Sequence, residues 1–279
     1  MIGQNTIDLR LKKSHTHTIK TFPDGQQQLT LSSDVHFSEK VYILSNFKNF
    51  LDVENIISAQ KILKHMGVNK THLFVPYFLG ARSDRRFSYF ESHYLKDVIC
   101  PVINSLGFER VYVLDPHSDV LEGILDNIYI IKPSVFLKYV YNKLDNPILI
   151  SPDANYHKKI PQLLNDIKYK KDLIQCTKIK NINENKIEKI IVPDVKKYDN
   201  FLIVDDIVDT GDTATLIARE IKKQNENSKI NLACCHGIFS KGLDIFDGLF
   251  ENIYTTNSYY DKDSCDFINV YNIFKIIDL

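Results

Sequence analysis

Short apolar runs alternate along the chain with segments whose apolar residues recur every three to four positions. The short runs predict β-strands at 41–44, 72–75, 110–114, 148–150, 201–204 and 230–235. The periodic segments predict helices at 55–65, 94–106, 158–166 and 213–224. Strands that are apolar throughout and alternate with helices are typical of parallel sheets covered on both faces, so the predicted fold class is α/β.

The alternation extends over more residues than one sheet of this kind needs. A chain of 279 residues has room for two α/β domains, each with its own sheet. We place the boundary near 131–133, which gives an N-terminal domain of residues 1–131 and a C-terminal domain of residues 132–279. Residues 178–189 are rich in Lys, Asn and Glu and poor in apolar residues, so we predict a mobile loop there.

The charge balance limits the partners of the protein. Lys and Arg together number 35, and Asp and Glu also number 35. No net field therefore favours nucleic acid or an anionic membrane, and phosphate recognition has to be local. We expect small-molecule substrates, no nucleic acid and no membrane partner.

The apolar runs and cysteines bear on localisation. No apolar run reaches the roughly 20 residues of a membrane-spanning helix, and residues 1–13 lack the apolar stretch of a secretory signal. The five cysteines lack Cys-x-x-Cys spacing and mostly lie among apolar residues, which predicts buried free thiols and a cytoplasmic protein. His15 and His17 form a His-x-His pair with no apparent third ligand, so we expect surface residues rather than a metal site.

One segment, residues 201–213, has the pattern of a substrate-binding loop. Its apolar strand delivers Asp205 and Asp206 to the carboxyl edge of a parallel sheet, where ligands of such sheets bind. A turn at Gly211 and a helix start follow, and their backbone N–H groups can hold a phosphate. The carboxylates can hold ribose hydroxyls or Mg²⁺. The alternative is an acidic strand end followed by a capped helix.

This segment resembles the phosphoribosyl-diphosphate binding loop of type I phosphoribosyltransferases and ribose-phosphate pyrophosphokinases. The matching residues are Asp205, Asp206, Asp209, Thr210, Gly211, Asp212 and Thr213. Further segments, from about residue 22 to residue 257, follow the order of the ribose-phosphate pyrophosphokinase family, which the chain resembles in a divergent and shortened form. The resemblance implies two type I phosphoribosyltransferase-like domains, each a mainly parallel sheet flanked by helices.

On the ATP side, the resemblance covers three segments. Residues 74–86 match the family's Pro-x-x-x-Tyr-Ala-Arg-Gln-Asp stretch, which implies that Arg82 and Asp84 contact ATP, with Ser83 in place of the usual Gln. His117, in Asp-Pro-His, matches a histidine that binds the metal–nucleotide. Residues 22–26 match a segment that holds adenine across a subunit interface. The adenine-binding residues are then Phe22, Asp24 and Gln26, with Gln26 in place of the usual Glu.

The remaining matches concern the metal and the catalytic cations. Asp153, in Ser-Pro-Asp-Ala, matches a carboxylate that serves the metal, although the Gly-Gly pair that follows in the family is Asn155-Tyr156 here. Lys178 and Lys180 fall on the paired basic residues of the catalytic loop, where the family usually has Lys-x-Arg. A solvated basic turn at Arg82 and a solvated charge run at the lysines are the alternatives.

The activity implied by the resemblance is transfer of the β,γ-pyrophosphoryl group of ATP to the anomeric hydroxyl of ribose 5-phosphate. Phosphoribosyl pyrophosphate and AMP would be the products. Mg²⁺–ATP would bind between the two domains, with Arg82, Lys178 and Lys180 stabilising the developing charge. Because the Phe22 segment acts across an interface in the family, we expect a homo-oligomer, either a dimer or a hexamer built of dimers.

Asp212 replaces the second glycine of the family's phosphate loop. A carboxylate that faces a phosphate dianion would repel it by about 1 kcal/mol or more at an effective dielectric constant near 20. Two acceptors therefore stay open, ribose 5-phosphate and a 5-phosphate-substituted ribose such as ADP-ribose. A catalytically silent regulatory homologue and a phosphoribosyltransferase are the alternatives from other functional classes. The chain lacks a P-loop sequence, which excludes a P-loop kinase.

Overall fold

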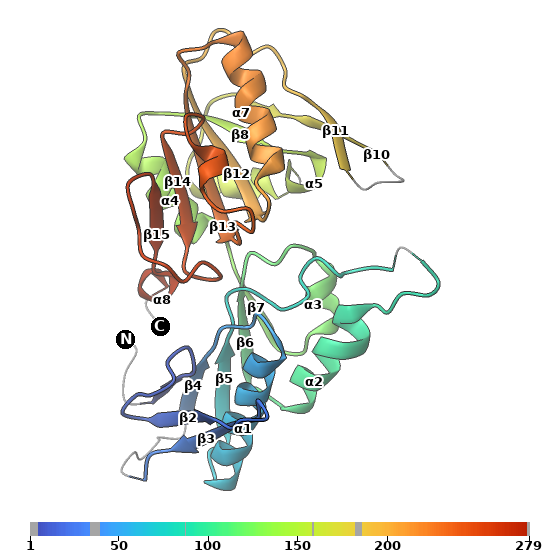
Figure 1. Cartoon of the computed structure of the whole chain (residues 1–279), viewed down its shortest axis with the longest axis vertical. Coiled ribbons are helices and arrows are strands. Elements are labelled where there is room, and N and C mark those ends of the chain that lie inside the picture. The colour runs from blue at the N-terminus through green and yellow to red at the C-terminus, as the bar shows by residue number, and fades with distance from the viewer. Residues whose placement is uncertain (1–4, 34–39, 87, 158, 182–185, 278–279) are drawn as a thin grey trace. The chain divides into compact units, whose positions relative to one another are not determined.

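The computed structural model of the protein describes residues 5–33, 40–86, 88–157, 159–181 and 186–277. The chain divides into two compact units, the first formed by Met1–Ile131 and the second by Lys132–Ile277 (Figure 1). Each unit has its own sheet and its own hydrophobic core.

The sheet of the first unit has five parallel strands in the order β1-β4-β5-β6-β7. The strands are β1 (Thr6–Asp8), β4 (Lys40–Leu44), β5 (Lys70–Phe74), β6 (Arg110–Leu114) and β7 (Ile128–Ile131). Alternate residues of the central strands, such as Val41, Leu73 and Val111, belong to one buried cluster with Ile56 and Leu63 of helix α1. One face of the sheet is therefore packed on helices, as strand periodicity requires.

Helix α1 (Phe50–His65) begins earlier than the predicted residue 55. Asn49 caps it, because its side chain accepts hydrogen bonds from the N–H groups of Leu51 and Asp52. The Asp52 side chain in turn accepts the N–H of Asn49, which completes a capping box. The apolar periodicity of 55–65 missed this first turn because the turn is mostly exposed.

The segment predicted as one helix at 94–106 consists of a π-helical turn, η1 (Tyr94–Ile99), followed by α2 (Cys100–Ser105). Pro101 has no N–H, so the carbonyl of Asp97 cannot receive the α-helical bond from that position. The N–H of Cys100 donates to the carbonyl of Leu95, five residues back, which is the π-helical pattern. A short helix, α3 (Val120–Ile124), completes the first unit.

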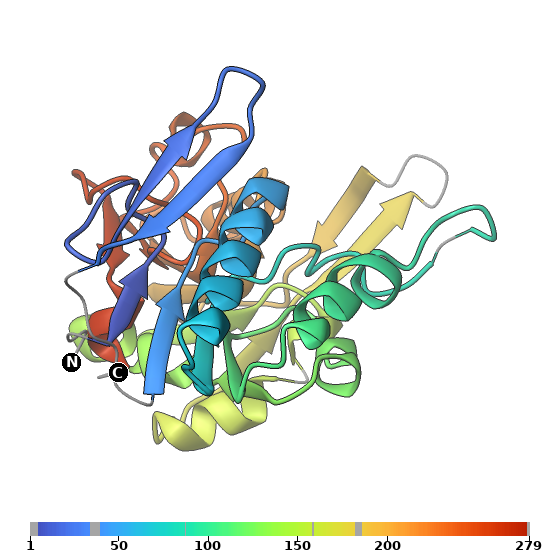
Figure 2. The ribbon, with the colours of Figure 1, turned by 90° about the horizontal axis from the view of Figure 1, so that it is seen from below.

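An antiparallel hairpin of the first unit, β2 (His17–Thr21) and β3 (Gln27–Leu31), was not predicted from the apolar pattern. The N–H of Gln27 donates to the Glu54 carboxylate of α1 at 3.3 Å, and the Asn55 side chain donates to the Gln27 side chain. These contacts hold the base of the hairpin against the helix, and Figure 2 shows the two elements beside each other.

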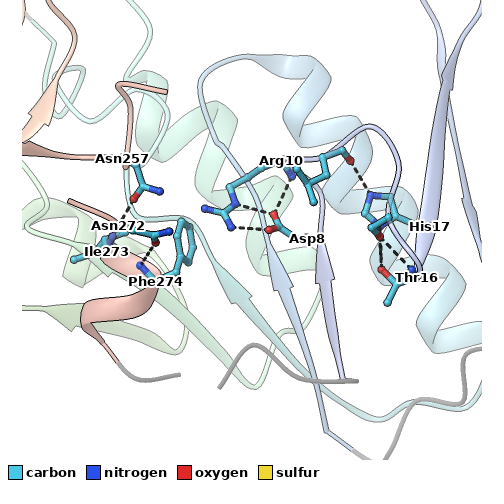
Figure 3. A network of polar contacts seen from close by, with 10 residues as sticks. Asp8, Arg10, Thr16, His17, Asn257, Asn272, Ile273 and Phe274 are labelled. Carbon is cyan, nitrogen blue, oxygen red and sulfur yellow. Dashed lines mark hydrogen bonds and ion pairs between the residues drawn. The ribbon is translucent and has the colours of Figure 1, made fainter. Parts of the chain in front are cut away.

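The prediction that His17 lies at the surface is wrong. Its side chain is fully buried, and its Nε2–H donates to the carbonyl of Leu11 at 2.9 Å. Its Nδ1 lies 3.0 Å from the hydroxyl of Ser14 and 3.1 Å from that of Thr16, both of which can donate to it (Figure 3). His17 therefore holds the start of the hairpin as a buried, fully hydrogen-bonded side chain.

The second unit contains a six-stranded parallel sheet in the order β15-β14-β13-β12-β8-β9. Its strands are β8 (Ile148–Ser151), β9 (Leu173–Gln175), β12 (Asn200–Val208), β13 (Lys229–Gly237), β14 (Asn252–Thr256) and β15 (Ile268–Tyr271). Its helices are α4 (Ser134–Lys143), α5 (Ala154–His157), α6 (Ile160–Asp166), α7 (Asp212–Gln224), the 3-10 turn η2 (Asp244–Phe246) and α8 (Ile273–Ile276). Ile217 and Ile221 of α7 pack in the same buried cluster as Phe201 and Ile203 of β12.

The prediction of a loop at 178–189 is corrected by an antiparallel pair of strands, β10 (Thr177–Asn181) and β11 (Lys186–Ile191). Both views show the pair extending from the second unit (Figures 1 and 2). Its register runs from Thr177 opposite Ile191 to Asn181 opposite Lys186. The ladder forms without a continuous apolar run, because β-branched residues favour strands and Ile190 of β11 packs in the core of the second unit.

Two further sequence expectations bear on the described residues. Four cysteines are buried and free, namely Cys100, Cys176, Cys234 and Cys235, while the free Cys265 is exposed. No helix in the described part of the chain is both long and apolar enough to cross a membrane.

Candidate active site

The candidate site of the second unit lies at the end of β12, which continues beyond the last residue that pairs with β8. Strand β8 pairs with β12 only over Phe201 to Ile203, so the edge of β12 beyond Ile203 has no partner on that side. In this part of β12, the carboxylates of Asp205 and Asp206 accept hydrogen bonds from backbone N–H groups of the strand. Asp205 Oδ1 accepts the N–H of Asp206 at 2.9 Å, and Asp206 Oδ1 accepts the N–H of Ile207 at 2.7 Å. The unpaired strand edge thus fixes both carboxylates at the carboxyl end of the sheet.

Two lysines from other segments meet these carboxylates. Lys159 Nζ lies 3.1 Å from Asp206 Oδ2, and Asp206 itself is buried. Lys178 Nζ, on β10, lies 3.1 Å from Asp153 Oδ2, beyond the end of β8. Lys178 and Asp153 are also close enough to Asp205 to shift its pKa. The structure therefore brings together four predicted residues, namely Asp153, Lys178, Asp205 and Asp206, and adds Lys159.

The electrostatics of the cluster single out Asp205. Desolvation of its carboxyl group, together with the negative charges of Asp206 and Asp153, raises the pKa of Asp205 well above its usual range. The positive charge of Lys178 and the hydrogen bond from the Asp206 N–H oppose this rise without cancelling it. A carboxylate with a raised pKa is a stronger proton acceptor than an ordinary carboxylate, so Asp205 is the candidate base of the cluster.

The loop at 209–213 leads from β12 into α7. Gly211 has φ +76°, and a Cβ at this position would lie 2.5 Å from the ring of Phe246. Only glycine meets both conditions, so the turn can bring backbone N–H groups of the α7 N-terminus to one side of the loop. Asp209, Thr210 and Thr213, the other predicted members, are half-buried in this turn.

Asp212 is the residue where the loop differs from the family pattern. Its Oδ1 and Oδ2 lie 2.7 and 2.9 Å from Lys241 Nζ, and Oδ2 also accepts the hydroxyl of Thr210 at 2.9 Å. The hydrogen bond from Lys241 and that from Thr210 hold the pKa of Asp212 below its usual range. The repulsion that the sequence predicted assumed an uncompensated carboxylate, and the Lys241 charge corrects that assumption.

The predicted ATP-side residues lie on exposed turns of the first unit. Phe22, Asp24 and Gln26 form the tip of the β2–β3 hairpin, where the N–H of Phe22 donates to the carbonyl of Gln26 at 2.9 Å. The Asp24 carboxylate accepts the N–H of Gln26 at 3.2 Å, and the Lys20 ammonium lies 4.9 Å from the centre of the Phe22 ring. The tip is thus shaped by local contacts, and it presents one aromatic ring.

Arg82 and Asp84 follow β5, and His117 follows β6, the neighbouring strand. Arg82 and His117 are exposed, while Asp84 Oδ1 lies 3.5 Å from Arg85 Nε. The hydrogen bond from the N–H of Leu114 to the carbonyl of Pro76, at 2.9 Å, ties the two strand ends together. Both loops therefore emerge at the same edge of the first sheet.

Two cations were missed by sequence reasoning. Lys159 lies in the Ser-Pro-Asp-Ala segment, and the family's basic residues at the end of that motif were the available signal. Lys241 follows Cys-His-Gly-Ile-Phe-Ser, and no local pattern in the sequence pointed to it. Lys180 lies in β10, but its side chain is outside the described part of the structure.

The described side chains offer few ligands for a Mg²⁺ ion. Among the residues that the structure describes, no three His, Cys, Asp or Glu side chains are grouped as a set of metal ligands. Asp153 offers a carboxylate whose Oδ2 contacts Lys178 and whose Oδ1 accepts the N–H of Tyr156 at 3.1 Å. Mg²⁺ is commonly held by one or two carboxylates and by substrate phosphates, so these residues fit an ion that arrives with ATP.

Comparison with known proteins follows the same direction. A ribose-phosphate pyrophosphokinase from Mycoplasmopsis pulmonis is 27% identical over 296 residues, covering 100% of this chain and 87% of the relative. A protein of the same name from Aquifex aeolicus is 29% identical over 231 residues, covering 80% and 71%. No protein-family model matches the chain.

A crystal structure of phosphoribosylpyrophosphate synthetase from Mycobacterium smegmatis superposes with a TM-score of 0.77 at 17% identity. The match covers 95% of this chain and 88% of that one, which confirms the predicted α/β fold with mainly parallel sheets flanked by helices. Taken with the ordered motifs, these matches show that the chain is similar to ribose-phosphate pyrophosphokinases along its whole length.

Proposed function

We propose that the protein is an ATP-dependent diphosphotransferase of the ribose-phosphate pyrophosphokinase type. The acceptor is ribose 5-phosphate, and the products are phosphoribosyl pyrophosphate and AMP. One observation carries the proposal in particular. Asp153, Lys178, Asp205 and Asp206 meet at the carboxyl edge of the second sheet, directly before the glycine turn that starts α7. An acidic strand end without a binding role has no need of these cations.

In this proposal the acceptor lies along the end of β12. Its phosphate takes backbone N–H groups of the 209–213 loop, and its hydroxyl groups donate to Asp205 and Asp206. The anomeric oxygen attacks the β-phosphorus of ATP in line, and the bond from the β-phosphorus to the α-phosphate oxygen breaks, so AMP leaves. Asp205 accepts the proton of the anomeric hydroxyl, a role that its raised pKa favours.

The cations act on the charge of the transferred group. Lys178 is held by Asp153, so it is oriented before substrates arrive, and it stabilises charge that grows on the equatorial oxygens. Arg82 and Lys180 are assigned the same task. Phe22, Asp24, Gln26 and Asp84 bind the nucleotide. Mg²⁺, held by Asp153 and His117 with oxygens of ATP, would neutralise part of the phosphate charge when bound.

The direct test is incubation of the purified protein with ATP and Mg²⁺ and either ribose 5-phosphate or ADP-ribose, with products identified by mass. We expect AMP and a diphosphorylated ribose 5-phosphate, both lost when EDTA removes Mg²⁺. Release of inorganic pyrophosphate from phosphoribosyl pyrophosphate and a free base would instead identify a phosphoribosyltransferase. Bound ATP without AMP formation from either acceptor would identify a silent homologue and overturn the proposal.

A 5-phosphate-substituted acceptor is the second candidate, because of the charged carboxylate of Asp212 in the phosphate loop. A phosphate within ADP-ribose carries less negative charge than the dianion of ribose 5-phosphate, so it meets less repulsion. Lys241 offsets part of this difference, which keeps ribose 5-phosphate in first place. AMP formation with ADP-ribose alone would retain the chemistry and change the acceptor.

A further inference from the structure

At the phosphate loop of the second unit, residues 209–213, three side chains from two segments contact one another. Thr210 and Asp212 belong to the loop, and Lys241 belongs to the turn that follows β13. Lys241 Nζ contacts both carboxylate oxygens of Asp212, at 2.7 and 2.9 Å, and Asp212 Oδ2 accepts the hydroxyl of Thr210 at 2.9 Å. The loop therefore has a cation fixed beside it to which the proposed mechanism assigns no contact with a substrate.

The turn that carries Lys241 is anchored on both sides of its tip. The N–H of Ile238 donates to the carbonyl of Val208 at 2.8 Å, and the N–H of Ser240 donates to the carbonyl of Asp209 at 3.0 Å. Phe239 has φ +50°, and its ring packs edge-on against Phe246, 5.7 Å between centroids. Phe246 also contacts the space beside Gly211, so one aromatic cluster supports both the loop and the turn.

The ammonium group of Lys241 has capacity left for a ligand. It carries three N–H donors, and the two contacts with Asp212 use at most two of them. The side chain of Lys241 is 50% exposed and that of Asp212 is 49% exposed, so the pair lies at the surface of the loop, where a bound phosphate would arrive. A surface ion pair of this kind contributes little to stability, which leaves its position at the loop unexplained by folding.

We propose that Lys241 binds the phosphate of the acceptor and that Asp212 is the positioning residue that holds Lys241 at the loop. This inference rests on the proposed function, because that function places the acceptor phosphate in the 209–213 loop. In the family pattern the position of Asp212 is a glycine, so a carboxylate and a lysine together replace an uncharged turn. The rival explanation is that Lys241 only neutralises Asp212 and never contacts the ligand.

A double-substitution cycle separates the two explanations. The variants are Lys241→Met, Asp212→Gly and the double variant, with Lys223→Met as the matched control, since Lys223 forms an exposed ion pair with Glu220 on α7. If Lys241 binds the phosphate, Lys241→Met raises the KM for the acceptor about tenfold, the loss of roughly one charge-assisted hydrogen bond. The KM for ATP and the Tm stay unchanged, and Asp212→Gly, which removes the partner that holds Lys241 at the loop, also raises the KM for the acceptor.

Two results would overturn the inference. If Asp212→Gly lowers the acceptor KM or leaves it unchanged, and the defect of Lys241→Met disappears in that background, Lys241 serves only as a counter-ion. If Lys241→Met changes the acceptor KM no more than Lys223→Met does, Lys241 does not touch the substrate. Calorimetric titration with ribose 5-phosphate in the absence of ATP measures acceptor binding without turnover. Its result therefore tests the phosphate contact independently of whether the protein forms AMP. Weaker binding by Lys241→Met in a protein that forms no AMP supports the phosphate contact and refutes the activity, whereas equal binding by both proteins refutes the contact.

Discussion

The two units present their candidate residues in different ways. In the second unit, the carboxylates and lysines contact one another, as in the pairs Lys159–Asp206 and Lys178–Asp153, both at 3.1 Å. In the first unit, Phe22, Arg82 and His117 lie on turns whose shape comes from backbone hydrogen bonds such as that from Phe22 to Gln26. The second unit thus has a preorganised charged site, while the candidate residues of the first unit lie on several different turns.

This difference suggests how the work is divided. Charged side chains that are already held in place by ion pairs do not have to reorient when charge develops on the substrate. The second unit is therefore suited to stabilise the transition state. Separate groups on exposed turns add binding contacts one at a time, so the first unit is suited to determine nucleotide affinity. Substitutions in the second unit should therefore lower kcat, and substitutions in the first unit should raise the KM for ATP.

The largest effect is expected for Lys178→Ala. The variant loses the cation beside Asp153 and Asp205, and kcat should fall about 10²- to 10³-fold, as for the loss of one preorganised charge-stabilising donor. Steady-state assay of AMP formation measures the change. Lys197→Ala is the matched control, because Lys197 forms an ion pair with Asp172 at the amino ends of the strands of the same sheet, away from the candidate site. Equal kcat values for the two variants would remove Lys178 from the mechanism.

A smaller effect, on binding, is expected for Phe22→Ala. Loss of base stacking should raise the KM for ATP roughly tenfold with little change in kcat. Phe50→Ala, which removes an exposed aromatic ring of α1, should leave the KM unchanged. If the hairpin acts across a subunit interface, dilution below the association range should mimic the substitution. Unchanged kinetics on both dilution and substitution would refute the shared adenine site.

Asp205→Asn should stabilise the second unit while it removes activity. Because the folded-state pKa of Asp205 is raised, the folded protein binds this proton more tightly than the unfolded chain. Stability is therefore lost as the pH rises from the usual carboxyl range to the raised pKa. At pH 7 the variant should gain about 1 kcal/mol, or roughly 2–4 °C in Tm.

Thermal unfolding at several pH values measures this gain for Asp205→Asn, and it should shrink towards pH 4. The exposed Asp263 provides the control substitution, Asp263→Asn, which should show no such trend. A Tm for Asp205→Asn below that of the wild type at pH 7 would contradict the raised pKa.

The smallest effect is expected in the first unit, with the opposite pH dependence. His72 is buried between Tyr42 and Tyr112, and desolvation and the nearby Lys40 charge lower its pKa, although Glu109 Oε2 lies 3.5 Å away. Stability should be lost as the pH falls from about 6.5 through the lowered pKa, by about 0.5–1 kcal/mol.

His72→Phe should remove this acid sensitivity, because a phenyl ring fits between the tyrosines and cannot be protonated. His65→Gln, at the exposed end of α1, should retain it. Thermal unfolding between pH 5 and pH 7 compares the three proteins. An equal loss of Tm on acidification in wild type and His72→Phe would show that another group titrates.

Much of the fold was determined by the sequence alone. The strands at 110–114 and 148–150 and the helix at 213–224 were found within about two residues at each end, because apolar periodicity reports burial directly. The hairpin at residues 17–31 and the ribbon at 177–191 were missed. Both are antiparallel pairs held by cross-strand bonds and by contacts with a helix, α1 for the hairpin and α7 for the ribbon, that the local apolar pattern does not report.

The candidate site divides in the same way. Local sequence determined the carboxylates at the end of β12 and the glycine turn, since strand direction and backbone freedom are properties of neighbouring residues. Only the tertiary structure decided which cation meets each carboxylate. Lys159 reaches Asp206 across 47 positions, and Lys241 reaches Asp212 across 29, because parallel strands bring distant loops to one edge. The net charge at the phosphate loop therefore depends on which strand lies beside β12, and the sequence of residues 201–213 alone does not determine this.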